Sequence, residues 1–318
     1  MRDEPFRKTD SHEAALEIEP PTVQIVAVVG AGTMGRGIAQ VVAQRGYAAT
    51  LHDADPDQLR NARAWVETTL AKGVERGKVS ESERSEALER LRFEGDLDQA
   101  VIDADLVIEA VPEDIALKRE LFGELDAHCS APAILASNTS SLSIAAIAES
   151  TARPERVVGL HFFNPVHVMK LVEIIVLEGT DAGVREALLD FVRALDKVPI
   201  VVRDTPGFAT SRLGIAIGLE AMRMLEEGVA SATDIDTAME LGYNHPMGPL
   251  KLTDLVGLDV RLAIADHLAR SIDPARFAAP RILRDLVARG KLGKKSGEGF
   301  YRWVDGAPVP VDASGKDS

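Results

Sequence analysis

The chain is poor in cysteine and has no long apolar run, and each shortage narrows its class. Cys129 is the single cysteine among 318 residues, which excludes an internal disulfide and favours a reducing compartment, the cytoplasm. No apolar run approaches the ~20 residues of a membrane-spanning helix, so we expect no membrane partner. Residues 1–21 are polar and lack the apolar segment of a secretory signal, so we expect a disordered tail there.

Basic side chains are also in short supply. The chain has 36 Lys and Arg residues against 50 Asp and Glu residues, which gives a formal net charge of −14. Nucleic-acid phosphates repel such a surface, so we expect no nucleic-acid partner. A small phosphate-bearing ligand is still compatible with this charge if a local basic site or a helix end receives it.

Strand-like and helical patterns alternate from Gln24 to about residue 204. Short apolar runs such as "QIVAVVG", "YAATLHD", "DLVIEAV" and "AILASN" are separated by helical stretches, which predicts parallel strands joined by right-handed crossovers. The charged stretch 56–92 is too long for an ordinary crossover, and we expect it to form an inserted helical hairpin. The predicted fold is therefore α/β, with a doubly wound Rossmann-type sheet.

A second region begins after "VRDTPGF", because the pattern beyond Gly207 is almost wholly helical. We therefore expect an all-helical C-terminal domain. The predicted division of the chain is a disordered tail at 1–21, an α/β domain at 22–204, a helical domain at 205–303 and a tail at 304–318.

The stretch "VVGAGTMGRGIAQ" carries Gly30, Gly32 and Gly35 in the spacing G-x-G-x-x-G, after a strand and at the start of a helix. In this context the glycines permit a tight turn, a close approach to a pyrophosphate and helix–strand packing. Asp53 ends the next strand, where an acid accepts hydrogen bonds from a ribose and repels a 2′-phosphate. The first domain is therefore expected to bind NAD rather than NADP. The alternative is that Asp53 only caps the following helix.

The stretch "VVGLHFFNPVHVMKLVEIIVLEG" contains a carboxylate, Glu173, inside an apolar strand. Burying it costs several kcal/mol without a partner. His161 lies twelve positions earlier across an Asn-Pro turn, so hairpin pairing would bring the two side chains to one face. A histidine held by a carboxylate is suited to general base catalysis. The alternative is a satisfied strand-end histidine and an edge glutamate that points to water.

The stretch "LASNTSSLSI", residues 135–144, places hydroxyls and an amide just after a predicted strand. Doubly wound folds bind ligands at the carboxyl ends of their strands, so this segment is a candidate ligand site. Simple capping of the following helix would require the same residue types.

Several motifs occur in a fixed order: "GAGTMGRGIA", "SNTSSL", "GLHFFNPV", "KLVEI", "DTPGF", "PMGP", "VGLD" and "GKKSGEGFY". Together they resemble the L-3-hydroxyacyl-CoA dehydrogenase family, in its stand-alone 3-hydroxybutyryl-CoA dehydrogenase form. The resemblance runs from about Gln24 to Tyr301.

The resemblance implies roles for individual residues. His161 would be the general base, Glu173 would orient it, and Ser140 would contact substrate and nicotinamide. The residues that it implies for cofactor binding are Gly30, Gly32, Met34, Gly35, Asp53, Glu113, Lys118 and Asn164. Those that it implies for substrate binding are Ser140, Ser211, Thr69 and Arg76, the last two in the helical hairpin beside the CoA nucleotide. Ser211 stands where the family usually has an asparagine, which puts substrate range in doubt more than reaction type.

The resemblance also implies a function: reversible, NAD-dependent oxidation of an L-3-hydroxyacyl-CoA, of short chain, to the 3-oxoacyl-CoA, without a metal. It implies a homodimer formed through the C-terminal helices, and the wide apolar arc of "GIAIGLEAMRML" fits a partner, although an ordinary core helix fits it equally well. Two alternatives remain open. One is a relative that acts on a small hydroxy compound without CoA, such as L-gulonate or L-carnitine, and the other is a non-catalytic NAD-binding protein.

Overall fold

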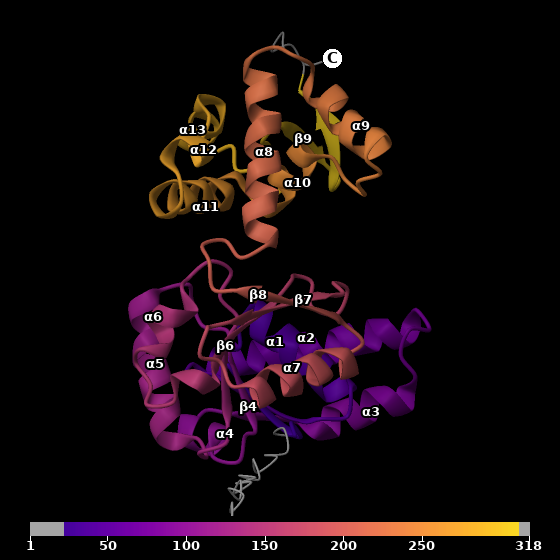
Figure 1. Cartoon of the computed structure of the whole chain (residues 1–318). Coiled ribbons are helices and arrows are strands. Elements are labelled where there is room, and N and C mark those ends of the chain that lie inside the picture. Colours follow the sequence, from indigo (N-terminus) through magenta and orange to yellow (C-terminus); the bar gives the residue numbers. More distant parts are fainter. Residues whose placement is uncertain (1–21, 312–318) are drawn as a thin grey trace, which may run out of the picture.

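The computed structural model describes residues 22–311 (Figure 1). The predicted tail at 1–21 and residues 312–318 lie outside the described residues. One sheet of eight strands has the order β3-β2-β1-β4-β5-β6-β7-β8. Its strands are β1 (Ile25–Val29), β2 (Ala48–His52), β3 (Leu91–Glu94), β4 (Leu106–Glu109), β5 (Ile134–Ser137), β6 (Val157–Phe162), β7 (Leu171–Val176) and β8 (Val198–Arg203).

Every neighbouring pair in this sheet is parallel except β6 and β7, which run antiparallel. The parallel pairs follow from the helical crossovers between them, as the alternating pattern predicted. The helices of this part of the chain are α1 (Thr33–Gln44), α2 (Pro56–Glu75), α3 (Glu81–Arg90), α4 (Leu97–Val101), α5 (Ile115–His128), α6 (Ile144–Ala148) and α7 (Ala182–Ala194), with a 3₁₀ turn η1 (Pro154–Arg156). The predicted doubly wound sheet is confirmed.

The charged stretch 56–92 forms the predicted helical hairpin, α2 and α3. Asp55 caps α2, with Pro56 at the first helical position, where its missing amide hydrogen costs nothing. Ser80 and Glu83 form a reciprocal capping box at the start of α3. The chain therefore carries strong local signals for the start of each helix of the hairpin.

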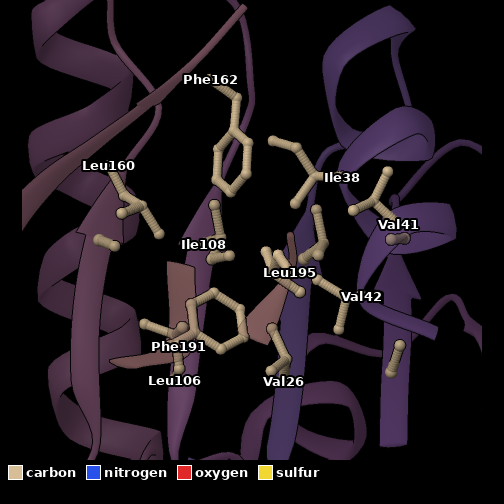
Figure 2. Packing of buried hydrophobic residues seen from close by; sticks show 14 of the residues in the cluster. Val26, Ile38, Val41, Val42, Leu106, Ile108, Leu160, Phe162, Phe191 and Leu195 are labelled. Carbon is tan, nitrogen blue, oxygen red and sulfur yellow. The ribbon is translucent and has the colours of Figure 1, made fainter. Parts of the chain in front are cut away.

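The main core lies between the sheet and helices α1 and α7. Figure 2 shows side chains of β1, β4 and β6 meeting those of α1 and of the α7 region. The labelled residues are Val26, Ile38, Val41, Val42, Leu106, Ile108, Leu160, Phe162, Phe191 and Leu195. This packing fixes β6, the strand that carries His161, against the helix that follows the glycine loop.

The C-terminal helices form a separate group above the sheet in Figure 1, reached through α8. They are α8 (Thr210–Glu226), α9 (Ala232–Gly242), α10 (Pro249–Val256), α11 (Leu258–Ser271), α12 (Pro274–Phe277) and α13 (Arg281–Ala288), with a 3₁₀ turn η2 (Lys294–Ser296). Their buried apolar residues, from Ile215 to Tyr301, form a core of their own. None of the helices among residues 22–311 is long and apolar enough to cross a bilayer.

One element of this region was not predicted. Strands β9 (Tyr301–Val304) and β10 (Ala307–Pro310) form an antiparallel hairpin, so part of the predicted tail at 304–318 is ordered. Asp305 and Gly306 both have positive φ, of 50° and 80°. This is the Asp-Gly turn that joins two-stranded hairpins. Each strand is only four residues long, which is too short for an alternating pattern to predict it.

Candidate active site

The glycine loop sits where β1 ends and α1 begins. Gly30 has φ +104°, and a Cβ at Gly35 would lie 1.7 Å from the Gly30 carbonyl oxygen, so both positions require glycine. The Ala31 amide donates to Asp53 Oδ2 at 2.8 Å. Asp53 therefore lies beside the loop at the end of β2, as predicted.

A cavity of about 920 Å³ opens beside this loop. It is lined by Gly30, Gly32, Thr33, Met34 and Asp53, by the segment that follows β4, and by residues of α5. The ionisable side chains that line it, apart from His52, are the acids Asp53, Glu120 and Glu124, and no Lys or Arg of the described chain is among its lining residues. A glycine cradle with acidic walls fits NAD and disfavours the additional phosphate of NADP.

A buried polar network lies at the carboxyl ends of β4 and β5. Lys118 Nζ donates to Glu109 Oε1 at 2.5 Å, with both side chains almost fully buried, and lies 3.4 Å from Glu113 Oε2. The Ser137 hydroxyl donates to Glu109 at 2.6 Å. The hydroxyl and the amide of Ser140 donate to Glu113 Oε1 at 3.2 and 3.0 Å. The structure thus brings together three residues for which a role was predicted: Glu113, Lys118 and Ser140.

Glu109 is the member of this network that sequence reasoning missed. It ends the apolar run "DLVIEAV", so a carboxylate at the end of a buried strand was available as a signal. Because Glu109 holds the ammonium group of Lys118, the two charges compensate each other inside the domain. Glu113, whose side chain is 40% exposed, extends this network to Ser140 in the loop after β5.

His161 and Glu173 face each other across the antiparallel pair β6–β7. Their Nδ1 and Oε2 atoms are 2.7 Å apart, with Glu173 fully buried and His161 7% exposed. Since an ionised carboxylate only accepts, Nδ1 carries the hydrogen and Nε2 is left as a base. The predicted pair exists, and the alternative of an edge glutamate pointing to water does not hold.

The turn between these strands lies against the glycine-loop helix. It contains a cis peptide bond between Asn164 and Pro165. A Cβ at Gly37 of α1 would lie 3.0 Å from the Val166 side chain. The Phe162 amide at the end of β6 donates to Asn138 Oδ1 at 2.9 Å. These contacts fix the end of the strand that presents His161.

The Glu173 carboxylate is also held from the C-terminal region. Its Oε1 accepts from the Ala209 and Thr210 amides at 3.2 and 2.9 Å, and its Oε2 accepts from the Thr210 hydroxyl at 2.9 Å. Burial by itself raises the pKa of Glu173, but hydrogen bonds from His161 and Thr210 outweigh it and leave the pKa lowered. Glu173 is therefore ionised at neutral pH.

Two aromatic rings shield the histidine. The ring centroids of Phe163 and Phe208 lie 4.4 and 6.1 Å from that of His161. Ser211, predicted to bind substrate, is the second residue of α8, next to Thr210. The first turn of α8 thus reaches the histidine pair, and Ser211 is part of that turn.

Thr69 and Arg76 line a different cavity, of about 650 Å³, between the helical hairpin, α1 and the segment after β6. This cavity is strongly basic: its lining includes Arg45, Lys72, Arg76, Lys78, Lys170 and Lys197, against the acids Glu83 and Asp196. Burial, with a smaller effect of Lys170 and Arg45, lowers the pKa of Lys197 to about 8. Six basic side chains against two acids make this cavity electropositive, although the whole chain has a net charge of −14.

Comparison with known proteins assigns the chain to a family. The model of the 3-hydroxyacyl-CoA dehydrogenase NAD binding domain matches residues 25–205, and that of the C-terminal domain of the same family matches 207–303. The chain belongs to the 3-hydroxyacyl-CoA dehydrogenase family. Its cofactor is NAD, and the resemblance seen in the sequence motifs is confirmed.

Curated relatives and solved structures agree with this membership. The human mitochondrial hydroxyacyl-coenzyme A dehydrogenase is 43% identical over 93% of this chain and 96% of its own length. A Mycobacterium tuberculosis 3-hydroxybutyryl-CoA dehydrogenase is 44% identical over 88% of this chain and 99% of its own length. The crystal structure of (S)-3-hydroxybutyryl-CoA dehydrogenase from Ralstonia eutropha is 37% identical, covers 89% of this chain and 100% of its own, and superimposes with a TM-score of 0.86.

Proposed function

We propose that the protein catalyses the reversible, NAD-dependent oxidation of short-chain L-3-hydroxyacyl-CoA, of the 3-hydroxybutyryl-CoA type, to 3-oxoacyl-CoA. The observation that carries the proposal is the buried His161–Glu173 pair, with its Nδ1–Oε2 distance of 2.7 Å. A histidine with its Nδ1 hydrogen bound to a carboxylate is a general base at Nε2. The relatives named above support the substrate class.

Each of these residues has a separate role in the proposed reaction. His161 Nε2 accepts the proton of the substrate hydroxyl, and Glu173 stabilises the imidazolium that this creates. Ser140, in the loop held by Glu113, positions the substrate oxygen. NAD, when bound in the glycine-loop cavity, supplies the hydride acceptor. In the reverse direction His161 returns the proton.

The basic cavity beside the hairpin supports a CoA substrate over a free hydroxy acid. CoA carries three phosphate groups, and the cavity that Thr69 and Arg76 line has six basic side chains against two acids. Arg45 and Lys170 pair with Asp196, and Lys197 donates to the carbonyls of Val166 and Met169. Among residues 22–311, Lys72, Arg76 and Lys78 form no ion pair, and a small compound such as L-gulonate or L-carnitine would leave these three cations without an anion. We therefore rank the CoA thioester above the small-substrate alternative.

The substrate test compares two ketones. With NADH, acetoacetyl-CoA should be reduced rapidly and free acetoacetate slowly, as followed by NADH absorbance. Equal rates would favour the small-substrate alternative, and a flat trace across a chain-length series of 3-oxoacyl-CoA substrates would favour a non-catalytic NAD-binding protein. NADPH run in parallel should be the poorer cofactor, because the acids Asp53, Glu120 and Glu124 line the cavity.

The mechanistic test removes the base. His161→Ala should lower kcat by about 10²- to 10⁴-fold, since it deletes general base catalysis. NADH affinity, measured by fluorescence titration, should stay near the wild-type value because His161 is not among the residues that line the cofactor cavity. Near-normal turnover in this variant would remove His161 from the mechanism.

The setting and the assembly are part of the proposal. The single cysteine, Cys129, is free and buried, which fits a reducing compartment, and we place the protein in the cytoplasm. We also infer a homodimer formed through the C-terminal helices. Exposed apolar side chains on α8, α10 and α11 support this.

A further inference from the structure

The carboxylate of Glu173 has four hydrogen-bond donors, and three of them belong to one end of one helix. Oε1 accepts from the Ala209 amide at 3.2 Å and from the Thr210 amide at 2.9 Å. Oε2 accepts from the Thr210 hydroxyl at 2.9 Å and from His161 Nδ1 at 2.7 Å. The oxygen that holds the histidine is therefore shared with a single side-chain hydroxyl.

The turn before α8 is shaped to deliver these donors. Gly207 and Phe208 both have positive φ, of 75° and 49°. A Cβ at Gly207 would lie 2.9 Å from the Leu268 side chain and 3.2 Å from the Arg212 amide nitrogen. For Phe208, a residue with a bulky side chain, this backbone conformation is unfavourable and persists only where the surroundings enforce it. The motif "DTPGF" thus aims the first free amides of α8 at Glu173.

The two backbone amide donors depend little on which residues occupy positions 209 and 210, whereas the hydroxyl donor depends on the residue at position 210. Almost any residue at positions 209 and 210 would supply the two amides. Only threonine or serine at position 210 places a hydroxyl within reach of Oε2 from this turn. A substitution at position 210 can therefore remove the hydroxyl donor from the oxygen bound to His161, while both backbone donors remain.

We propose that Thr210 is a positioning residue for the reaction: its hydroxyl bonds Glu173 Oε2 and so controls how that oxygen holds and aims His161. The proposal rests on the function assigned to the pair above. Thr210 touches neither substrate nor cofactor in this role, and it acts through Glu173. Because Thr210 opens the C-terminal region, the general base of the first domain is coupled to the placement of the second.

The expected effect follows from the donors that remain. Without the hydroxyl, Oε2 has His161 as its one donor and attracts the Nδ1 hydrogen more strongly, which favours the imidazolium. His161 is the one titratable partner among the hydrogen bonds that the structure gives Glu173. The rings next to the histidine, Phe163 and Phe208, are uncharged. Losing the hydroxyl should therefore move the histidine titration to higher pH.

The test compares Thr210→Val with Thr210→Ser in the full-length protein. Valine keeps the branched shape and both amides but removes the hydroxyl, and serine restores it. Thr205→Val is the matched control, because Thr205 is exposed in the same linker and its hydroxyl reaches only the Arg203 carbonyl, at 3.4 Å. The His161 imidazole is titrated by NMR with ¹⁵N-labelled histidine, and His161→Gln assigns its signal among seven histidines.

In Thr210→Val we expect the His161 titration midpoint to rise by roughly half to one pH unit. The acidic limb of the kcat/KM profile for oxidation should move with it, and kcat/KM at pH 7 should fall several-fold. Thr210→Ser and Thr205→Val should behave as the wild type does. An unmoved histidine titration in Thr210→Val, with or without a lower melting temperature, would overturn the proposal. The NMR titration needs no substrate. If the protein did not turn over 3-hydroxyacyl-CoA, the proposed function would be refuted, but the titration would still test the role of Thr210.

Discussion

At the residue scale, burial removes two charged side chains from water, and hydrogen bonds compensate one of them better than the other. Glu173 is fully buried and receives four hydrogen bonds, which keep it ionised and fix the histidine. Arg261 of α11 is 7% exposed, and its Nε has no hydrogen-bond partner among residues 22–311. Burial lowers the pKa of its guanidinium to about 10. The missing hydrogen bond at Nε leaves part of this buried charge uncompensated, which destabilises the folded state.

Replacing Arg261 with methionine should therefore stabilise the protein. We expect Arg261→Met to raise the free energy of unfolding by about 1–3 kcal/mol, measured by urea denaturation. The folded pKa of about 10 lies below the ordinary value, so the penalty is present at every pH below about 10, and the gain should be equal at pH 6 and pH 9. Arg281→Met, at a side chain that is 86% exposed, is the control and should change stability by less than ~0.5 kcal/mol. A loss of stability in Arg261→Met would mean that the guanidinium supports the fold.

The residue scale also shows what the sequence could and could not reveal. The pairing of His161 with Glu173 was predictable, because a carboxylate inside an apolar strand demands a partner and the intervening turn brings one opposite. The clamp from Thr210 was not, since it depends on two positive φ values at Gly207 and Phe208 that place a distant helix end against the strand. No periodicity or spacing encodes such a contact between domains.

At the element scale, two buried carboxylates tie the C-terminal hairpin to the helices. Asp254 of α10 accepts from the Phe300 and Tyr301 amides at 2.8 and 2.9 Å and from the Trp303 indole at 3.0 Å. Asp236 of α9 accepts from the Tyr301 hydroxyl at 2.7 Å. The hairpin β9–β10 is thus held by side chains that are remote in sequence, so the short strands gain their stability from tertiary contacts. Their "YRWV" run is too short to predict them alone.

The same two carboxylates explain why two of the sequence motifs contain a glycine at a fixed position. A Cβ at Gly248, in "PMGP", would lie 2.2 Å from the Asp236 side chain. A Cβ at Gly299, in "GKKSGEGFY", would lie 2.2 Å from Asp254 Oδ1. Both glycines let backbone approach a buried acid. The geometry of both motifs therefore serves the fold of the C-terminal region.

Substituting the second of these glycines should damage that region. We expect Gly299→Ala to lower the free energy of unfolding by about 2–4 kcal/mol, since the added methyl group must displace the buried Asp254 carboxylate from its three donors. Circular dichroism during urea denaturation measures the loss. Gly242→Ala is the control, because nothing lies within 4 Å of a Cβ there and the residue ends α9. An equal effect of the two substitutions would contradict the clash.

At the scale of the whole molecule, the sheet domain has two cavities that differ in charge. The sheet domain holds the acid-walled cofactor cavity on one side and the basic cavity beside the hairpin on another. The net charge of −14 conceals this division, and only the fold gathers Arg45, Arg76 and Lys170 from distant positions. The sequence could therefore predict the dinucleotide site from a local motif, but it gave no sign of how strongly basic the second cavity is.

The C-terminal helices leave an apolar surface that argues for a second copy of the chain. Helices α8, α10 and α11 pack against one another. They leave these large apolar side chains exposed: Leu213, Ile217, Leu252, Leu255, Val256 and Val260. An apolar cavity of about 370 Å³ between α8 and α9 lies beside Ile217. Clusters of exposed apolar side chains on helices that already pack together are typical of subunit interfaces.

A charge placed on this surface should separate the subunits. We expect the wild type to sediment at twice its 34.2 kDa chain mass, and Leu213→Glu to sediment as a monomer, because Leu213 is 63% exposed in the single chain and two copies already share a large negative charge. Ile102→Glu, at a 53% exposed site on the first domain, is the control and should stay dimeric. Sedimentation of the wild type as a monomer at micromolar concentration would contradict the interface. Because Leu213 lies one turn from Thr210, the measurement also bears on catalysis: if association steadies the start of α8, the Leu213→Glu monomer should lose turnover while it still binds NADH.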